Sequence, residues 1–309
     1  MKLSILVLVY NHGEFLDECL ESVFSQNCTF DFEVLVGEDC STDNSLEICK
    51  KFQKKYPNQF KLFQREENVG MLNNFYNLID SATGEYIAFL EGDDYWTDTR
   101  KLKLQAEALD SNLDCSITYH NVNMFFGEGL DGSERLYVKR NQPLKVGVKE
   151  VIENEVFMHT SSLMIRTKSI ISTPSSFFTY SMGDIPITIF ALRDGSQALY
   201  IDKIMSSYRK NLGGITFKFN KKRIKTVLNY ILMYRDLNEL LDYKYNSSFM
   251  HAEQKKFIEV TSLHIKNKNY EVANIYQKVC NKYLQIFKIK LLVKTILNQT
   301  RIVFGSLNK

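Results

Sequence analysis

The sequence predicts an α/β fold, in which a mostly parallel sheet is flanked by helices and followed by an all-helical C-terminal extension. Over the first hundred residues, short β-rich apolar runs alternate with segments of helical periodicity, which is the pattern of a parallel sheet covered on both faces. Beyond residue 218, glycine is absent until Gly305 and proline is absent altogether. We therefore expect an α/β domain over residues 1–217 and a helical region over residues 218–309.

The strands of the first third are predicted from apolar runs that end in turn or acidic residues. Four runs have the length and composition of buried strands: residues 3–10, 32–37, 61–64 and 87–90. Helical patterns lie between them, over residues 14–25, after the candidate N-caps at 41–43, and after residues 68–70.

The middle third is less regular, and it predicts additional strands of mixed direction. The β-like runs here are residues 115–120, 122–126, 161–166, 198–201 and 205–208. Residues 127–133 look like a surface loop, and residues 184–193 like a helix with Pro186 in its first turn. The C-terminal helices are expected at residues 221–243, 249–267, 270–284 and 286–303.

Composition restricts the class of protein. The 309 residues carry a net charge of only +3, which gives no indication of a nucleic-acid partner. None of the six cysteines forms a C-x-x-C pair, so neither a zinc ribbon nor a redox motif is predicted. We see no signal-peptide pattern and no apolar run near the roughly 20 residues that cross a bilayer. The expectation is a cytoplasmic protein with free thiols.

Acidic residues follow two of the predicted strands. Glu38 and Asp39 end the second strand, and the fourth ends in Glu91, Asp93 and Asp94. The carboxyl ends of parallel strands meet at the edge where α/β sheets bind ligands. Carboxylates this close together favour a hard divalent cation, Mg²⁺ or Mn²⁺, which often binds phosphates as well. The alternative is a solvated acidic turn in which an Asp caps the next helix.

The first strand brings Tyr10 and Asn11 to the same edge. Tyr10 offers a ring on which a base can stack, and Asp39 can accept hydrogen bonds from a base or a ribose. A cation on Asp93 would neutralise a diphosphate. These groups predict a nucleoside-diphosphate site. It is not of the Walker or dinucleotide type, because neither glycine-rich motif occurs.

Four segments in this order resemble the family 2 inverting glycosyltransferases of the GT-A fold. They are LVLVYNHG at 6–13, LDECLESVFSQ at 16–26, VGEDCSTDNS at 36–45 and GEYIAFLEGDD at 84–94. The resemblance extends over about residues 1–215, and it makes residues 1–217 the expected catalytic domain. It implies a nucleotide-sugar donor and a Mn²⁺ or Mg²⁺ cofactor.

The resemblance also implies roles for individual residues. Tyr10 and Asp39 would contact the base, and Asp93 would bind the metal as part of a D-x-D motif that begins here with Glu91. Asp184 resembles the catalytic base, and Arg209 belongs to a Y-R motif near the diphosphate. Many members place a metal-binding His two residues after that Arg, where this chain has Asn211, a weaker oxygen ligand.

Several of these residues also have plain structural interpretations. Asp184 can cap the helix ahead of Pro186, and one side chain can serve as both base and cap. Asn68 can bring backbone N–H groups to the ligand or simply precede a helix. His159 can line the acceptor side or be a satisfied structural histidine. Trp96 can stack on a sugar or close the core.

The expected activity is the transfer of one sugar per encounter to a glycan or lipid-linked acceptor in cell-surface polysaccharide synthesis. Trp96 is the only tryptophan, so the Q-x-x-R-W signature of processive polymerases is absent. One alternative is a non-catalytic scaffold of a glycan-assembly complex. A weaker one is a sugar-phosphate nucleotidyltransferase, which normally carries a glycine-rich basic loop after the first strand, where residues 11–14 do not match.

The end of the chain is basic and apolar. After Glu271 there are seven Lys or Arg residues and no Asp or Glu, interleaved with Ile, Leu, Val and Phe. One interpretation is an amphipathic helix on the inner face of the cell membrane, bound to anionic lipid. The other is a packed helical bundle with a cationic outer face.

Overall fold

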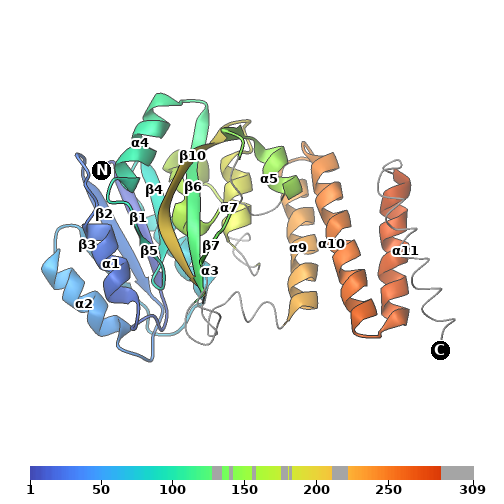
Figure 1. Cartoon of the computed structure of the whole chain (residues 1–309), viewed down its shortest axis with the longest axis horizontal. Coiled ribbons are helices and arrows are strands. Elements are labelled where there is room, and N and C mark those ends of the chain that lie inside the picture. The colour runs from blue at the N-terminus through green and yellow to red at the C-terminus, as the bar shows by residue number, and fades with distance from the viewer. Residues whose placement is uncertain are drawn as a thin grey trace. The chain divides into compact units, whose positions relative to one another are not determined.

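A computed structural model describes residues 1–126, 134–138, 142–154, 158–174, 180, 183–210 and 222–286. The chain divides into two compact units, Met1–Lys221 and Lys222–Lys309 (Figure 1). The first holds the sheet with its helices, and in the second all described elements are helices.

The first unit is built on one large sheet. Among the described residues it has ten strands, with the order β3-β2-β1-β4-β9-β6-β10-β5, while β7 pairs with β6 and β8 with β10. The bounds of the strands are β1 Leu3–Val9, β2 Phe32–Glu38, β3 Phe60–Gln64, β4 Tyr86–Glu91, β5 Tyr95–Trp96, β6 Cys115–Phe126, β7 Glu134–Leu136, β8 Lys145–Val146, β9 Met164–Arg166 and β10 Gln197–Lys210.

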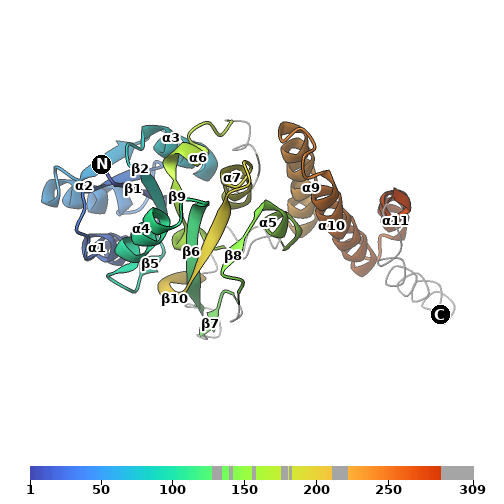
Figure 2. The same cartoon turned by 90° about the horizontal axis from the view of Figure 1, so that it is seen from above.

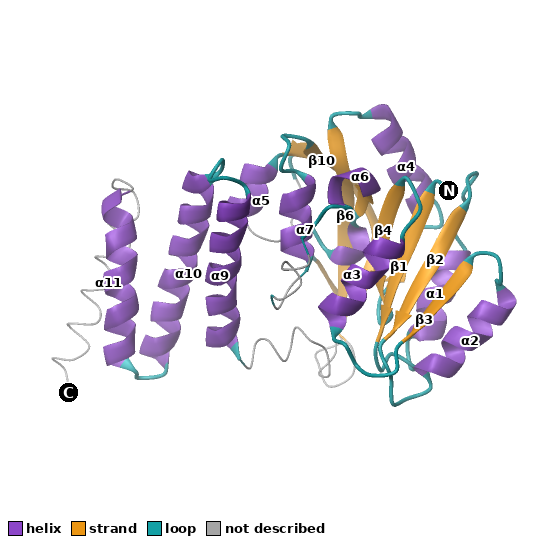
Figure 3. Cartoon of the chain, turned by 180° about the vertical axis from the view of Figure 1, so that it is seen from behind, coloured by secondary structure: helices purple, strands orange, loops and turns teal. Residues whose placement is uncertain are grey.

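Helices cover both faces of this sheet. On one face lie α1 (Leu16–Phe24), α2 (Ser45–Lys55) and α4 (Lys101–Ser111), and on the other α3 (Met71–Ser81), α6 (Thr167–Ile170) and α7 (Asp184–Ala191) (Figures 2 and 3). The shorter elements α5 (Val148–Asn154) and the 3₁₀ turn η1 (Thr160–Ser162) connect strands in the middle of the chain.

Burial on both faces explains the apolar character of the central strands. Every residue of β1 and β2 is buried. Val7 and Val34 belong to the core shared with Leu20 of α1 and Phe52 of α2. On the opposite face, the ring of Phe75 in α3 stacks on Phe89 of β4, with 5.1 Å between centroids. The predicted α/β architecture is therefore confirmed.

Strand direction decides which chain segments reach the ligand edge. β1 runs parallel to β2 and β4, so the carboxyl ends of these three strands lie side by side. β9 runs antiparallel to β4 and β6, so it is the start of β9, with η1 just before it, that lies at this edge. β10 is parallel to β6, and its end returns to the same edge.

The structure corrects three details of the prediction. Residues 115–126 form one strand. Residues 197–210 also form one strand, and its register with β6 shifts around Ile204, close to the polar residues that suggested a break between two strands. Only the second half of the run 161–166 is a strand, because Thr160–Ser162 form the turn η1. Asn44 occupies the N-cap position of α2 without a side-chain hydrogen bond, whereas the predicted cap residue Asp43 accepts the N–H of Ser45 at 3.0 Å.

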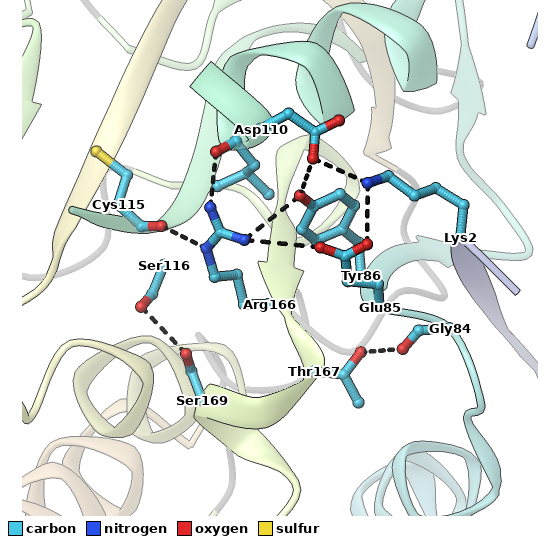
Figure 4. A network of polar contacts seen from close by, with 11 residues as sticks. Lys2, Gly84, Glu85, Tyr86, Asp110, Cys115, Ser116, Arg166, Thr167 and Ser169 are labelled. Carbon is cyan, nitrogen blue, oxygen red and sulfur yellow. Dashed lines mark hydrogen bonds and ion pairs between the residues drawn. The ribbon is translucent and has the colours of Figure 1, made fainter. Parts of the chain in front are cut away.

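A polar network fixes β9 at the opposite edge of the sheet (Figure 4). The buried Arg166 donates to the carbonyl of Cys115 at 2.9 Å and to that of Leu109 at 2.6 Å. Beside it, Asp110 accepts hydrogen bonds from the Tyr86 hydroxyl and from Lys2. These contacts join β4, β9, α4 and the start of β6, and so they hold the strand that begins at the ligand edge.

The second unit contains α9 (Arg223–Leu240), α10 (Asn246–Lys266) and α11 (Tyr270–Ile286), which lie side by side (Figures 1 and 2). Their buried contacts centre on Ile231, Phe257 and Cys280. Three of the four predicted helices are confirmed, while residues 286–303 lie almost wholly outside the described residues. No helix of the described part of the chain is long and apolar enough to cross a membrane.

Candidate active site

Two carboxylates and one imidazole meet where β4 ends. Glu91 is the last residue of β4, and Asp94 lies in the turn that follows. The N–H of Asp94 donates to the Glu91 carbonyl at 2.9 Å. His159 comes from the segment just before η1. One side-chain ligand atom from each residue lies within 4.8 Å of the other two. We call this group the Glu91–Asp94–His159 cluster.

Asp94 is held firmly but is incompletely paired. Asp94 is 1% exposed, and its Oδ1 accepts the backbone N–H of Arg209 at 2.9 Å. Its Oδ2 is buried without a hydrogen-bond partner among the described residues. Burial, with the nearby carboxylates of Asp93 and Glu91, raises the pKa of Asp94 well above its ordinary range. A cation would compensate both the missing partner and the excess negative charge.

Glu91 connects this cluster to Asp184. Burial, together with the carboxylates of Asp93 and Asp184, raises the pKa of Glu91 to about 8, although hydrogen bonds with the side chains of Thr160 and Asp94 oppose the rise. The charge of Asp184 therefore acts on the end of β4, although the two residues are far apart in the sequence. The proposed base and the acidic turn belong to one electrostatic site.

Asp184 is the first residue of α7, and Gly183 occupies the cap position. Its Oδ1 accepts the N–H of Ile185 at 3.0 Å, so the carboxylate does contact the helix N-terminus. Burial raises the pKa of Asp184 above its ordinary value. A carboxylate with a raised pKa is a better proton acceptor at neutral pH. The contact with Ile185 and a role as base are compatible.

His159 is oriented by its neighbours. Its Nδ1 lies 2.9 Å from the Ser161 hydroxyl, which in turn lies 3.1 Å from that of Ser206. The ring packs against those of Tyr208 and Tyr137, with centroids 4.3 and 5.0 Å away. Burial lowers the pKa of His159 to about 3, so the imidazole is neutral at physiological pH. Its Nδ1 also accepts the backbone N–H of Ser161 at 3.3 Å, which favours the tautomer with the proton on Nε2.

Asp93 points to a different neighbour. Its Oδ1 lies 3.9 Å from Nε2 of His12, which is in the turn after β1. Asp93 is not a member of the Glu91–Asp94–His159 cluster. The predicted role of Asp93 as the metal ligand remains a prediction, and Asn211, the other predicted ligand, lies outside the described residues.

Arg209 lies over the acidic turn. Its Nε donates to the Asp93 carbonyl at 3.1 Å, and its guanidinium forms an ion pair with Glu18 at 2.6 Å. The guanidinium also lies over the ring of Phe15, 4.6 Å from the centroid. These contacts place a cation beside the carboxylates, where a diphosphate would need one.

Tyr10 and Asn11 follow β1 as predicted. The Tyr10 side chain is 43% exposed and therefore accessible to a ligand. Asn11 has a left-handed backbone with φ 56°, and its side-chain oxygen accepts the N–H of Thr42 at 2.7 Å. Since its own N–H donates to Ser41 at 3.0 Å, Asn11 joins the loops after β1 and β2.

Asp39 has backbone partners on both of its oxygens. The residue is 2% exposed, and it accepts the N–H groups of Val69 at 2.8 Å and of Gly70 at 2.9 Å. The Gly70 N–H is therefore directed at Asp39, while the exposed Asn68 lies just before this pair. Asp39 shapes the loop that opens α3, and a contact between Asp39 and a base remains a prediction.

Comparison with known sequences identifies the family. Residues 4–171 match the family described as glycosyl transferase family 2. The chain belongs to this family.

A protein of Mycobacterium tuberculosis described as uncharacterized is 28% identical over 221 residues, which cover 69% of this chain and 60% of that protein. The chain thus spans about three fifths of the length of that curated relative. Solved structures show the same fold.

Staphylococcus aureus TarS 1–349, in complex with UDP-GlcNAc, has a TM-score of 0.56 at 18% identity, covering 91% of this chain and 92% of that chain. The mannosyltransferase PcManGT from Pyrobaculum calidifontis, in complex with GDP-Man and Mn²⁺, has a TM-score of 0.58 at 13% identity, covering 98% of this chain and 80% of that chain. These likenesses confirm the predicted GT-A fold.

Sequence reasoning missed three contacts of this site. It did not place His159 beside Glu91, because that requires the direction of β9, which the sequence pattern does not reveal. The ion pair of Arg209 with Glu18 spans most of the domain in sequence, and nothing local indicates it. The approach of His12 to Asp93 was weakly indicated by the sequence, because each residue follows a strand and the two strands were predicted to be parallel.

Proposed function

We propose that this chain is an inverting, non-processive glycosyltransferase. It would move a sugar from a nucleoside-diphosphate donor to a hydroxyl of a glycan or lipid-linked acceptor in cell-surface polysaccharide synthesis. One observation carries the proposal: in a chain of family 2, ligand atoms of Glu91, Asp94 and His159 lie within 4.8 Å of one another where β4 ends. This arrangement supports a site for a diphosphate at the end of β4, and Asp184 would be the base beside it.

The donor would lie along the ends of β1, β2 and β4. The exposed ring of Tyr10 offers a surface on which a nucleobase can stack. Arg209, whose Nε donates to the Asp93 carbonyl, would contact the phosphates. The TarS and PcManGT structures were solved with UDP-GlcNAc and with GDP-Man, so nucleotide sugars are the donor class that we propose.

A divalent cation, Mn²⁺ or Mg²⁺, fits the residues after β4. The unpaired Oδ2 of Asp94 and the mutual repulsion of Glu91, Asp93 and Asp94 are the observations that support it. When bound, the cation would neutralise charge on the departing diphosphate. Arg209 would add a second positive group on the same side.

The chemistry requires one proton acceptor and no enzyme nucleophile. Asp184 would accept the proton of the acceptor hydroxyl as its oxygen bonds to the anomeric carbon. The bond between that carbon and the diphosphate breaks in the same displacement, which inverts the anomeric centre. The nucleoside diphosphate leaves with the bonding electron pair.

The test is release of nucleoside diphosphate from UDP-GlcNAc and GDP-mannose, measured with Mn²⁺ and with Mg²⁺. Asp184→Asn should lower the rate by about 10²- to 10⁴-fold, because it removes the proposed base. Asp194→Asn, at an exposed position just after α7, is the matched control and should keep the native rate. An Asp184→Asn rate within twofold of native contradicts the role of Asp184.

A non-catalytic scaffold is the second candidate, and the same measurements separate it. A scaffold would release no nucleoside diphosphate from any donor, and donors would not raise its melting temperature. The unpaired oxygen of Asp94 argues against this candidate, since a purely structural acid is normally satisfied by hydrogen bonds.

A further inference from the structure

The side chain of Arg209 is held by α1, by β5 and by the turn after β4. Its Nη2 forms an ion pair at 2.6 Å with Glu18, in the first turn of α1. Its Nε donates to the carbonyl of Asp93 at 3.1 Å. The guanidinium also lies over the rings of Phe15, just before α1, and of Tyr95 in β5, with centroids 4.6 and 5.5 Å away. The end of β10 therefore presents this long side chain in one orientation.

One nitrogen of this guanidinium is left for a ligand. The hydrogen bonds that Arg209 forms with described residues use its backbone N–H, its Nε and its Nη2, and none uses Nη1. The side chain is 17% exposed, so it is partly accessible. A guanidinium that is anchored through two nitrogens and open at the third can bind a phosphate oxygen without changing its orientation.

The ion pair between Glu18 and Arg209 has little value for folding alone. The Glu18 side chain is 53% exposed, and ion pairs at such exposed positions contribute little to stability, because water and salt screen the charges. Its effect on orientation is larger. Ordering an arginine side chain costs conformational entropy, and a ligand that binds an arginine already held in place does not bear that cost.

We propose that Glu18 is a positioning residue, which holds Arg209 in the orientation that binds the diphosphate of the donor. The inference rests on the proposed function, and it adds a residue of α1 that acts through Arg209. The alternative is that Glu18 masks Arg209 and that its charge repels the diphosphate. The two roles differ in sign: a positioning carboxylate strengthens diphosphate binding, whereas a masking carboxylate weakens it.

The test measures binding of UDP and of GDP to the full chain by calorimetry, in the presence of MgCl₂. Glu18→Ala should weaken binding by about five- to tenfold, because the ligand must then order Arg209 itself. Glu18→Gln should bind within about twofold of native, since its amide oxygen still accepts a hydrogen bond from Nη2. Glu21→Ala is the matched control: it removes an equally exposed ion pair of α1, with Lys55, and should keep the native affinity.

A double-mutant cycle tests whether Arg209 transmits the effect. In an Arg209→Ala background, Glu18→Ala should change the affinity by no more than about twofold, because the side chain that Glu18 orients is gone. A role of Glu18 in folding alone would give the same loss in both backgrounds. Melting temperatures of all variants show that each is folded, as the half-exposed position of Glu18 leads us to expect.

Four results overturn the inference: tighter binding by both Glu18 variants, native affinity in Glu18→Ala, equal losses in Glu18→Ala and Glu18→Gln, or an undiminished loss in the Arg209→Ala background. Donor cleavage separates the two proposals. Cleavage with native affinity in Glu18→Ala removes only this inference. The expected losses without cleavage of any donor remove only the proposed function and leave Glu18 as the orienting residue of a nucleotide site.

Discussion

At the residue scale, hydrogen bonding separates structural acids from candidate functional ones. Glu33 and Asp39 are both almost fully buried, and each has partners on both carboxylate oxygens. Asp94 is equally buried, but one of its oxygens has no partner among the described residues. Burial alone does not distinguish these acids. The distinction comes from whether the protein itself satisfies the buried charge.

Asp39→Asn should destabilise the protein by about 1–3 kcal/mol, because an amide cannot accept both the Val69 and the Gly70 N–H groups and leaves one unpaired. Urea unfolding of the purified protein measures this change. Asp80→Asn, on the exposed side of α3, is the control and should stay within about 0.5 kcal/mol of native. Unchanged stability of Asp39→Asn would show that these two contacts are weak.

Glu33 predicts a pH dependence of stability. Burial alone would raise its pKa, but hydrogen bonds from Lys61, Thr83 and Ser4 lower the pKa from 4.5 to about 2. A pKa lowered in the folded state gives stability that is present above pH 4.5 and is lost as the pH falls toward 2. Glu33→Gln should therefore cost about 1–3 kcal/mol at pH 7 and progressively less below pH 4.5.

Unfolding free energies of native protein and Glu33→Gln between pH 7 and pH 2 check this expectation. The exposed Glu47→Gln in α2 provides the control and should follow the native curve. A difference between native and Glu33→Gln that is independent of pH would refute the assignment of the stability to the ionised carboxylate.

At the element scale, the short strand β9 and the turn η1 complete the site. β9 is antiparallel to its neighbours, so it delivers η1 to the edge where β4 ends. α4 supports η1 from behind: Gln105 donates to the Ser162 carbonyl at 2.8 Å and accepts from Lys101 at 2.7 Å. Lys101 lies over the Trp96 ring, and Trp96 donates to the Ser161 carbonyl at 3.1 Å.

Gln105→Leu should cost about 1–3 kcal/mol of stability, because it leaves the Ser162 carbonyl and the Lys101 amine unpaired in a buried place. The double variant Lys101→Met/Gln105→Leu should recover part of this loss, since it removes the stranded amine as well. Denaturant unfolding of these two variants and of Lys101→Met gives the coupling free energy between the two sites. Strictly additive losses would mean that the two side chains act independently.

Element directions also explain which predictions from sequence succeeded. The strands before residue 95 and their acidic ends were predictable, because each depends on a local run of residues with a fixed period. The trio of Glu91, Asp94 and His159 was not, because it depends on the antiparallel direction of β9. Asp39 was predicted as a binding acid from its position, and its contacts with Val69 and Gly70 became visible only in three dimensions.

At the scale of the whole molecule, the two units differ in what they offer a partner. The first contains the edge with the candidate site. The second contributes helices α9 to α11 and leads into residues 287–309, which carry five Lys or Arg residues and no acid. Such a segment favours anionic surfaces, and the attraction weakens as salt screens the charges.

The full chain should therefore sediment with vesicles that contain anionic lipid at low salt, and much less so at about 1 M salt, where screening is nearly complete. Deleting residues 287–309 should abolish this binding, while vesicles of zwitterionic lipid serve as the control. Equal recovery in the supernatant with both kinds of vesicle would favour the alternative, a basic helix face that belongs to a packed bundle.

The path of the chain between β6 and β9 has a consequence for evolution. Because β6 runs parallel to β4 and β9 runs against it, this connection departs from the carboxylate-bearing rim and comes back to it. Insertions or deletions in this connection, outside β7 and β8, can therefore change what surrounds the reacting groups while the pairings of β4, β6, β9 and β10 with one another stay intact. Relatives that glycosylate different acceptors are expected to vary most in the length and composition of this stretch.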